Sequence, residues 1–241
     1  MGGYESGDTV SRQRQEQEDR RFSRFSGIVD PKAIQASSVN LIGCGGIGSW
    51  VALALGCLGV KLTLFDPDAT QRHNFGGQPL GRIGVKKVEQ LRDMMAGFAG
   101  QVEVVERLFG LEEASEYPAS IWVSGVDSIG ARREILHALG KQLDDGKGPG
   151  WYIDCRMGGT ASNLLVVQTS DTVAMQRYVK SLRPAGRFVN NLCAQRSTVF
   201  AGMGVAAEAV GEVARILRGE AVSRQRNMEW MSGMEVEGWT A

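Results

Sequence analysis

The sequence has no excess of charge of either sign and no long hydrophobic run. Its 241 residues carry 27 basic and 27 acidic side chains, so the formal net charge is zero. A balanced charge gives no electrostatic reason to expect a nucleic acid or an anionic membrane as a partner. The longest apolar runs have about ten residues, roughly half of what a helix needs to span a bilayer. The N-terminus also lacks the apolar core of a secretory signal.

Closely spaced cysteine pairs are lacking as well. The four cysteines, Cys44, Cys57, Cys155 and Cys193, form no C-x-x-C motif. This spacing argues against a structural zinc site and against a disulfide-bonded scaffold. A reduced cytoplasm fits best, and we expect Cys44, Cys57 and Cys155 to be packing residues.

The chain also shows no internal repeat and no low-complexity linker. Residues 1–20 are heavily charged from Arg12 onward, and they are predicted to form a polar arm that is solvated or lies on a partner subunit. Residues 21–241 are predicted to form a single domain, and a chain of this length buries roughly 70–75% of its unfolded surface.

What the sequence does contain is a strand, a glycine-rich turn, a helix and a second strand in direct succession. Residues 39–42 form an apolar run typical of a buried strand, and the turn Gly43-Cys44-Gly45-Gly46-Ile47-Gly48 follows. An apolar helix is predicted as far as Gly59, and the next strand, 61–65, ends in Asp66-Pro67-Asp68. Such glycines let backbone N–H groups approach a phosphate, and the helix N-terminus adds positive potential. Together with an acid placed to hold ribose hydroxyls, the pattern predicts nucleotide binding without identifying the nucleotide.

The rest of the chain predicts a Rossmann-like, doubly wound α/β fold. Its sheet is expected to be mainly parallel, with additional antiparallel strands in the C-terminal part. The apolar patterns predict helices over 84–98, 131–143 and 199–217, and strands over 101–105, 121–124 and 151–155. Residues 162–170 and 172–182 are predicted to be two strands, or one strand and an irregular loop, and 228–239 a terminal hairpin.

Further motifs make the chain resemble the E1-like superfamily of the ThiF, MoeB and HesA type. That family's pattern is R-[YF]-x-R, G-x-G-G-x-G, D-x-D, N-x-x-R-Q, G-x-x-K and D-N-x-x-x-R. The matching segments here begin at Arg21, Gly43, Asp66, Asn74, Gly84 and Asp127, in the family's order and with its spacing, and the likeness extends from about residue 21 to 218.

The resemblance implies an ATP-dependent adenylyltransferase that activates the C-terminal glycine of a small ubiquitin-like or sulfur-carrier protein ending in Gly-Gly. It implies that the protein works as a homodimer with ATP and Mg²⁺. Gly43, Gly45, Gly46 and Gly48 would line the nucleotide, with Asp66 on the ribose and Asp68 beside it. The roles that it implies for the remaining side chains are triphosphate contacts from Asn74, Gln78 and Lys87, Mg²⁺ binding by Asp127, and an arginine finger from the neighbouring protomer, Arg24.

Two departures from the family pattern stand out. The arginine of N-x-x-R-Q is Gly77 here, so one cation expected at the phosphates is missing, and Arg72, Arg82 or Lys86 is a candidate replacement. Many relatives also carry two C-x-x-C pairs late in the chain, and this sequence has neither, so no structural zinc is expected.

Alternatives remain open for single residues. Asp127 is either a metal ligand or the N-cap of the next helix, and Lys87 is either a phosphate contact or a solvated helix residue. Cys193 falls where thiamin-type members keep a transfer cysteine, so it is either a catalytic thiol or a small packing residue.

Alternatives also remain for the whole protein. Because of Gly77, a nucleotide-binding scaffold with little catalysis is the second hypothesis. An NAD-dependent oxidoreductase is the third, and it leaves Asn74, Gln78, Lys87 and Asp127 unexplained.

Overall fold

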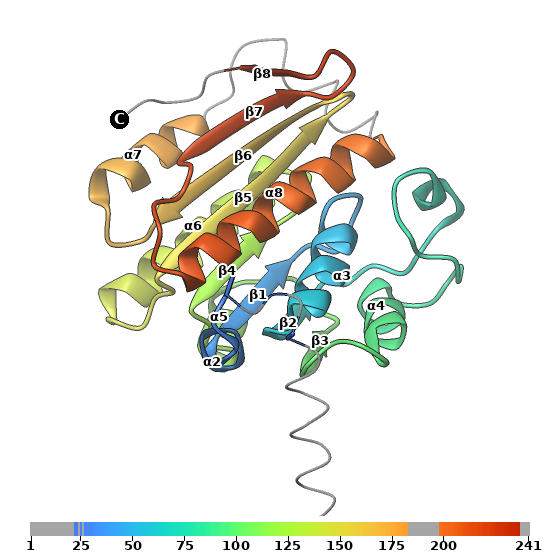
Figure 1. Ribbon diagram of the computed structural model, residues 1–241, viewed down its shortest axis with the longest axis horizontal. Coiled ribbons are helices and arrows are strands. Elements are labelled where there is room, and N and C mark those ends of the chain that lie inside the picture. Colours follow the sequence, from blue (N-terminus) through green and yellow to red (C-terminus); the bar gives the residue numbers. More distant parts are fainter. Residues whose placement is uncertain (1–21, 24, 26, 183–197, 237–241) are drawn as a thin grey trace, which may run out of the picture.

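The computed structural model describes residues 22–23, 25, 27–182 and 198–236, and in this part of the chain eight strands form one mixed sheet. The strand order is β3-β2-β1-β4-β5-β6-β7-β8 (Figure 1). The first five strands in this order are parallel, and they are β3 (Val102–Val105), β2 (Lys61–Phe65), β1 (Ser38–Ile42), β4 (Ile121–Ser124) and β5 (Trp151–Gly158). Three antiparallel strands complete the sheet, β6 (Ala161–Gln168), β7 (Gln225–Glu229) and β8 (Met234–Val236).

Helices cover both faces of this sheet (Figure 1). One hydrophobic core packs the sheet against the helices α2 (Pro31–Ala36), α3 (Gly48–Leu58), α4 (Lys87–Met95) and α8 (Val199–Leu217). A second core, on the opposite face, packs it against α5 (Leu111–Glu116), α6 (Ile129–Asp144) and α7 (Thr172–Ser181). The central strands β1 and β4 are buried along almost their whole length, which explains why they are short, mainly apolar runs in the sequence, whereas β3 is partly exposed and alternates.

The predicted fold class is confirmed. The predicted strands at 39–42, 61–65, 101–105, 121–124 and 151–155 are all present, and the helix predicted over 199–217 has the same bounds as α8. The predicted terminal hairpin is present as β7 and β8, with its turn at Ser232 and Gly233. Residues 1–20, Arg24 and Cys193 lie outside the described residues, as does the segment 237–239 of the hairpin.

The prediction for 172–182 is wrong, because this segment is the helix α7. Asp171 caps its N-terminus, with a side-chain oxygen 2.9 Å from the backbone nitrogen of Ala174. Ala174 and Tyr178, four residues apart, are the buried positions of the helix. Both features, an Asp N-cap and an apolar pair with helical spacing, are present in the sequence.

Candidate nucleotide site

The glycine turn joins β1 to α3, and it can form only because its glycines lack side chains. Gly43 has a φ of +86°, a conformation that residues with a side chain rarely adopt. A Cβ atom on Gly48 would lie 1.8 Å from the carbonyl oxygen of Gly43. Gly45 and Gly46 are only half-buried, so their backbone is accessible from outside the turn. The turn is therefore tightly closed on its inner side and open to a ligand at Gly45 and Gly46.

This turn lies at the switch point of the sheet, where the chain order reverses between β1 and β4. In open α/β sheets, ligands bind in the crevice outside the carboxyl ends of the strands at this point. The turn after β4 closes onto the glycine turn: a Cβ atom on Gly125 would lie 3.0 Å from the backbone nitrogen of Gly48. Asp127 follows two residues later, so it lies at the same end of the sheet as the glycine turn, since Ile42 and Ser124 pair in register.

Asp66, at the end of β2, is buried beside the glycine turn. Its carboxylate accepts hydrogen bonds from the backbone N–H groups of Cys44, at 2.7 Å, and Asp68, at 2.8 Å. Burial raises the pKa of the Asp66 carboxyl above its ordinary value, while the charge of Lys87 and the two N–H groups oppose this shift. Asp66 therefore holds the turn in place in addition to its predicted contact with the ribose.

Lys87 reaches the same place from the first turn of α4. Its ammonium lies 2.8 Å from an Asp68 carboxylate oxygen and 3.7 Å from one of Asp66. The Lys87 side chain is 8% exposed, whereas that of Asp68 is 67% exposed. The interpretation of Lys87 as a solvated helix residue is therefore wrong, and its positive charge lies beside Asp66, which binds the glycine turn.

The segment that carries Asn74 and Gln78 is anchored to α3. Residues 72–76 form a short 3-10 helix, η1 (Arg72–Gly76), in which the Asn74 side chain accepts a hydrogen bond from the backbone of Gln71. The indole of Trp50, in α3, donates to the carbonyl oxygen of Gly77, over 2.9 Å. Oε1 of Gln78 is buried and has no hydrogen-bond partner among the described residues. A buried amide without a partner carries a desolvation cost that a bound ligand would remove.

Of the three candidate replacements for the missing arginine, one is directed at the site. Lys86 donates to the carbonyl oxygen of Pro67, over 2.5 Å, between the two aspartates. Arg82 instead forms an exposed ion pair with Asp93, and Arg72 is exposed on η1.

Asp127 is exposed at the end of β4, and it makes no hydrogen bond or ion pair with the residues that the structure describes. The N-cap of α6 is Ser128, whose hydroxyl accepts from the backbone of Ala131 over 3.1 Å. The interpretation of Asp127 as this cap is therefore wrong. No group of three potential metal ligands occurs within the described ranges. A single carboxylate nevertheless fits Mg²⁺, because this ion is usually held by one or two carboxylates, water and substrate phosphates.

The sequence profile of the ThiF family matches residues 17–234. The chain belongs to the ThiF family. This match covers most of the sequence, including every motif described above, and it confirms the resemblance to E1-like proteins.

Solved structures show the same fold at low sequence identity. E. coli MccB with ATP superposes with a TM-score of 0.67 and 15% identity, over 91% of this chain and 70% of that chain. PaaA gives a TM-score of 0.69 and 18% identity, over 99% and 75% of the two chains. E. coli tRNA N6-threonylcarbamoyladenosine dehydratase, TcdA, in complex with ATP, gives 0.62 and 17%, over 83% and 94%. No curated protein matches this ThiF-family sequence significantly.

A buried polar cluster lies next to the end of β4, and it was not predicted from the sequence. Asp154, in β5, has no exposed surface and accepts from Arg132, in α6, at 3.0 and 3.2 Å, and from Arg156 at 2.6 Å. The hydroxyl of Ser124, the last residue of β4, also donates to it over 2.9 Å. A charged residue within an apolar strand pattern was the available signal, because a buried charge requires partners. Arg132 is thus part of the scaffold that fixes the end of β4, directly before the turn that carries Asp127.

Two cysteine predictions are supported and one is wrong. Cys44 and Cys155 are buried, and burial raises the pKa of both thiols, so they are unreactive packing residues. Cys57 is exposed on α3, so it does not pack in the core. Within the described part of the chain, no helix is both long enough and apolar enough to cross a membrane.

Proposed function

We propose that this ThiF-family protein is an ATP-dependent adenylyltransferase that activates the C-terminal carboxylate of a small protein. The observation that carries this proposal is the buried Lys87 ammonium, held by Asp66 and Asp68 next to the glycine turn. The triphosphate of ATP carries more negative charge than the pyrophosphate of NAD, so a cation at this place favours ATP over a hydride-transfer cofactor. The Asp127 carboxylate and Oε1 of Gln78, neither of which has a partner among the described residues, support the same ligand.

The proposed reaction needs positioning and positive charge more than proton transfer. A C-terminal carboxylate is ionised near neutral pH, so it can attack the α-phosphorus of ATP without a general base, and pyrophosphate leaves. Lys87 would attract the phosphate oxygens, and Lys86 would supply part of the charge that Gly77 lacks. Asp127 would hold Mg²⁺, which when bound neutralises charge on the phosphates.

The proposed partner is a small ubiquitin-like or sulfur-carrier protein that ends in Gly-Gly, and the proposed assembly is a homodimer in which Arg24 serves the neighbouring site. Relatives of the same fold provide limited support, since MccB has been crystallised with AMPCPP and MccA together. Cys193 remains a candidate acceptor for the activated acyl group. The zero net charge gives no reason to propose an RNA substrate.

The test is calorimetric titration of the full-length protein with ATP in the presence and absence of Mg²⁺, and with NAD in parallel. We expect ATP to bind with strong dependence on Mg²⁺ and NAD not to bind. Pyrophosphate exchange in the presence of a small protein or peptide ending in Gly-Gly then tests catalysis. Binding of NAD in preference to ATP would contradict the proposal.

A nucleotide-binding scaffold is the second candidate, and it is favoured by Gly77 alone. It predicts normal ATP binding without pyrophosphate exchange for any carboxylate. Replacing Lys86 by Met separates the two: exchange that falls while ATP binding persists indicates an enzyme in which Lys86 compensates for Gly77.

A further inference from the structure

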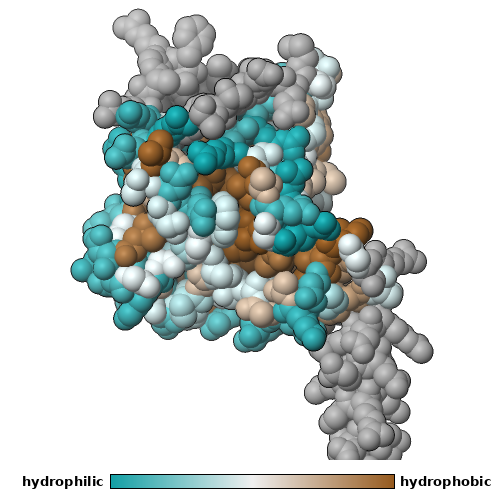
Figure 2. All heavy atoms as spheres, turned by 60° about the vertical axis from the view of Figure 1, so that its left-hand side comes forward, coloured by the Kyte–Doolittle hydropathy of each residue, from teal (hydrophilic) through white to brown (hydrophobic). Residues whose placement is uncertain are grey.

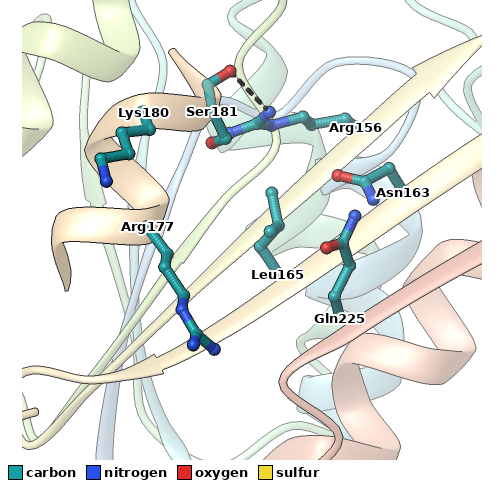
Figure 3. A pocket seen from close by; sticks show the side chains of 7 residues that line it. All are labelled: Arg156, Asn163, Leu165, Arg177, Lys180, Ser181 and Gln225. Atoms are coloured by element: carbon teal, nitrogen blue, oxygen red, sulfur yellow. Dashed lines mark hydrogen bonds between the residues drawn. The ribbon is translucent and has the colours of Figure 1, made fainter. Parts of the chain in front are cut away.

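A cleft of about 340 Å³ lies on the antiparallel side of the sheet, against α7. Figure 3 shows Arg177 and Lys180 on the helix side and Asn163 and Gln225 on the strands, with Leu165 between them. The described residues that line it are Arg156, Asn163, Leu165, Arg177, Lys180, Ser181 and Gln225.

The lining carries three cations and no acid. The cation at the inner end, Arg156, binds Asp154, but Arg132 binds the same carboxylate. Two guanidinium groups thus share one negative charge, and the cluster behind the cleft retains a net positive charge. The Lys180 ammonium, on the exposed side of α7, adds to it and has no ion pair among the described residues. A carboxylate in the cleft would meet unbalanced positive charge on two sides.

The strand side of the cleft presents amide groups. Gln225 donates from Nε2 to Asn227, while its Oε1 is buried without a partner among the residues described. The Asn163 amide also donates to the Asn227 side chain. An unpartnered buried acceptor is best satisfied by an N–H donor of a ligand. Cations for a carboxylate together with an acceptor for an N–H group match an acidic peptide segment.

The cleft lies at the same edge of the sheet as the nucleotide site. Ser124, the last residue of β4, pairs with Asp154 of the parallel strand β5. Arg156 follows Asp154 by two residues, so it lies level with the turn after β4 that carries Asp127. The crevice between β1 and β4 is two to three strands from β6, which is about 10–14 Å at the usual strand spacing. An extended peptide covers this distance with three to four residues, at about 3.3 Å each. The face of the molecule in Figure 2 is hydrophilic over most of its area, with hydrophobic residues gathered near its centre.

We propose that this cleft binds an acidic side chain of the partner polypeptide, three to four residues ahead of the C-terminal carboxylate that is activated. The inference rests on the proposed function, because it takes the reacting carboxylate to lie at the nucleotide crevice. The acid lies between α7 and the strands, near Arg156 and Lys180. A neighbouring backbone N–H group donates to Gln225.

The test is a positional library of hexapeptides that end in Gly-Gly with a free carboxylate, retained on the immobilised full-length protein without ATP. We expect Asp and Glu to be enriched three or four residues before the C-terminal residue. Lys180→Glu should reduce this enrichment about tenfold, because it replaces an attraction by a repulsion. Lys141→Glu is the matched control: Lys141 is also an exposed lysine in the last turn of a helix, α6, and the enrichment should persist.

The inference would be overturned if no peptides were retained or if the retained peptides showed no preference for Asp and Glu. It would also be overturned if the Lys180→Glu protein enriched these acids as strongly as the wild type. A preference for acids at every position would also overturn it, because that indicates general attraction of anions. Thermal unfolding of both variants confirms that they fold. Since the library is read without ATP, Mg²⁺-dependent ATP binding is measured separately, and failure of the cleft is distinguishable from failure of adenylation.

Discussion

Lys87 and Asp66 form the most informative pair at the level of single residues, because both are buried and each limits the cost of burying the other. Replacing Lys87 by Met leaves the Asp66 carboxylate buried with only its backbone partners. We expect a loss of about 3 kcal/mol in the free energy of unfolding, as for other broken buried pairs, together with loss of ATP binding. The double variant Lys87→Met/Asp66→Asn should regain part of the stability without regaining ATP binding. Chemical denaturation and calorimetry measure the two effects, and a fully stable Lys87→Met protein would contradict this account.

The same variant has a defined pH dependence. Burial raises the pKa of folded Asp66, and Lys87 lowers it, so Lys87→Met raises it further. Between the ordinary carboxyl pKa, about 4, and the raised folded value, the folded state binds more protons than the unfolded state. Its stability therefore increases as the pH falls through this window. The difference in free energy of unfolding between wild type and Lys87→Met should be largest near neutral pH and smaller in mild acid. Chemical denaturation at several pH values measures it, and a difference that increases in acid would contradict this explanation.

Asp127 and Ser128 are neighbours in sequence with separable roles. Asp127→Asn should abolish Mg²⁺-dependent pyrophosphate exchange and leave the stability unchanged, because the Asp127 side chain has no partner among the described residues. Ser128→Ala should cost about 1 kcal/mol of stability through loss of the N-cap and should retain exchange. Unchanged exchange in Asp127→Asn would remove Asp127 from the site.

Single residues were predictable where they belong to a local motif. The glycine turn, Asp66 and Lys87 follow from spacing along the sequence, and the structure brings them together. Asp154 and Arg132 were not identified as partners because they lie in different elements, β5 and α6. They come into contact because β5 pairs with β4, the strand that precedes α6.

The glycine turn and α8 are coupled at the level of elements. A Cβ atom on Gly202, in the first turn of α8, would lie 2.5 Å from the carbonyl oxygen of Gly46, whereas one on Gly211, in the same helix, would meet nothing within 4 Å. Gly202→Ala should therefore displace the turn, cost about 1–3 kcal/mol and weaken ATP binding.

Gly211→Ala is the control for this prediction. It should stabilise the protein by up to about 1 kcal/mol through helix propensity and leave ATP binding unchanged. Thermal unfolding and ATP titration distinguish the two variants. Equal ATP affinities would show that α8 does not position the turn.

Element prediction succeeded for the parallel half of the sheet and failed next to it. Strands that are buried along most of their length are mainly apolar, so β1, β2 and β4 are visible in the sequence. The apolar residues of α7 come in two groups, Val173-Ala174-Met175 and Tyr178-Val179, which have helical spacing and not the alternation of a strand. The helix begins after the Asp171 cap, and Tyr178 packs it into the second core. Short elements such as α2 and α5, with six residues each, lack enough periodicity to be predicted.

At the level of the whole molecule, the sheet divides into two functional halves. The parallel strands and their switch point carry the candidate nucleotide residues, and the antiparallel strands carry the cationic cleft. Asp154 joins the halves, since it binds Arg132 behind the nucleotide crevice and Arg156 in the cleft. The topology thus accounts for how the proposed ATP site at one edge of the sheet can have a second substrate site beside it, which no local motif predicts.

The proposed homodimer is testable with two inactive variants. If Arg24 serves the neighbouring site, then Arg24→Ala and Asp127→Asn each disable both sites of their own homodimer. In a mixed dimer, one site receives Arg24 from the Asp127→Asn subunit and Asp127 from the Arg24→Ala subunit. Because a two-fold dimer has two equivalent sites, random mixing should restore about a quarter of the wild-type exchange activity. Restoration requires exchange of subunits, which is verified by co-purification of the untagged variant with an affinity-tagged one. A mixture that exchanges subunits yet stays inactive would show that Arg24 acts within its own chain or not at all.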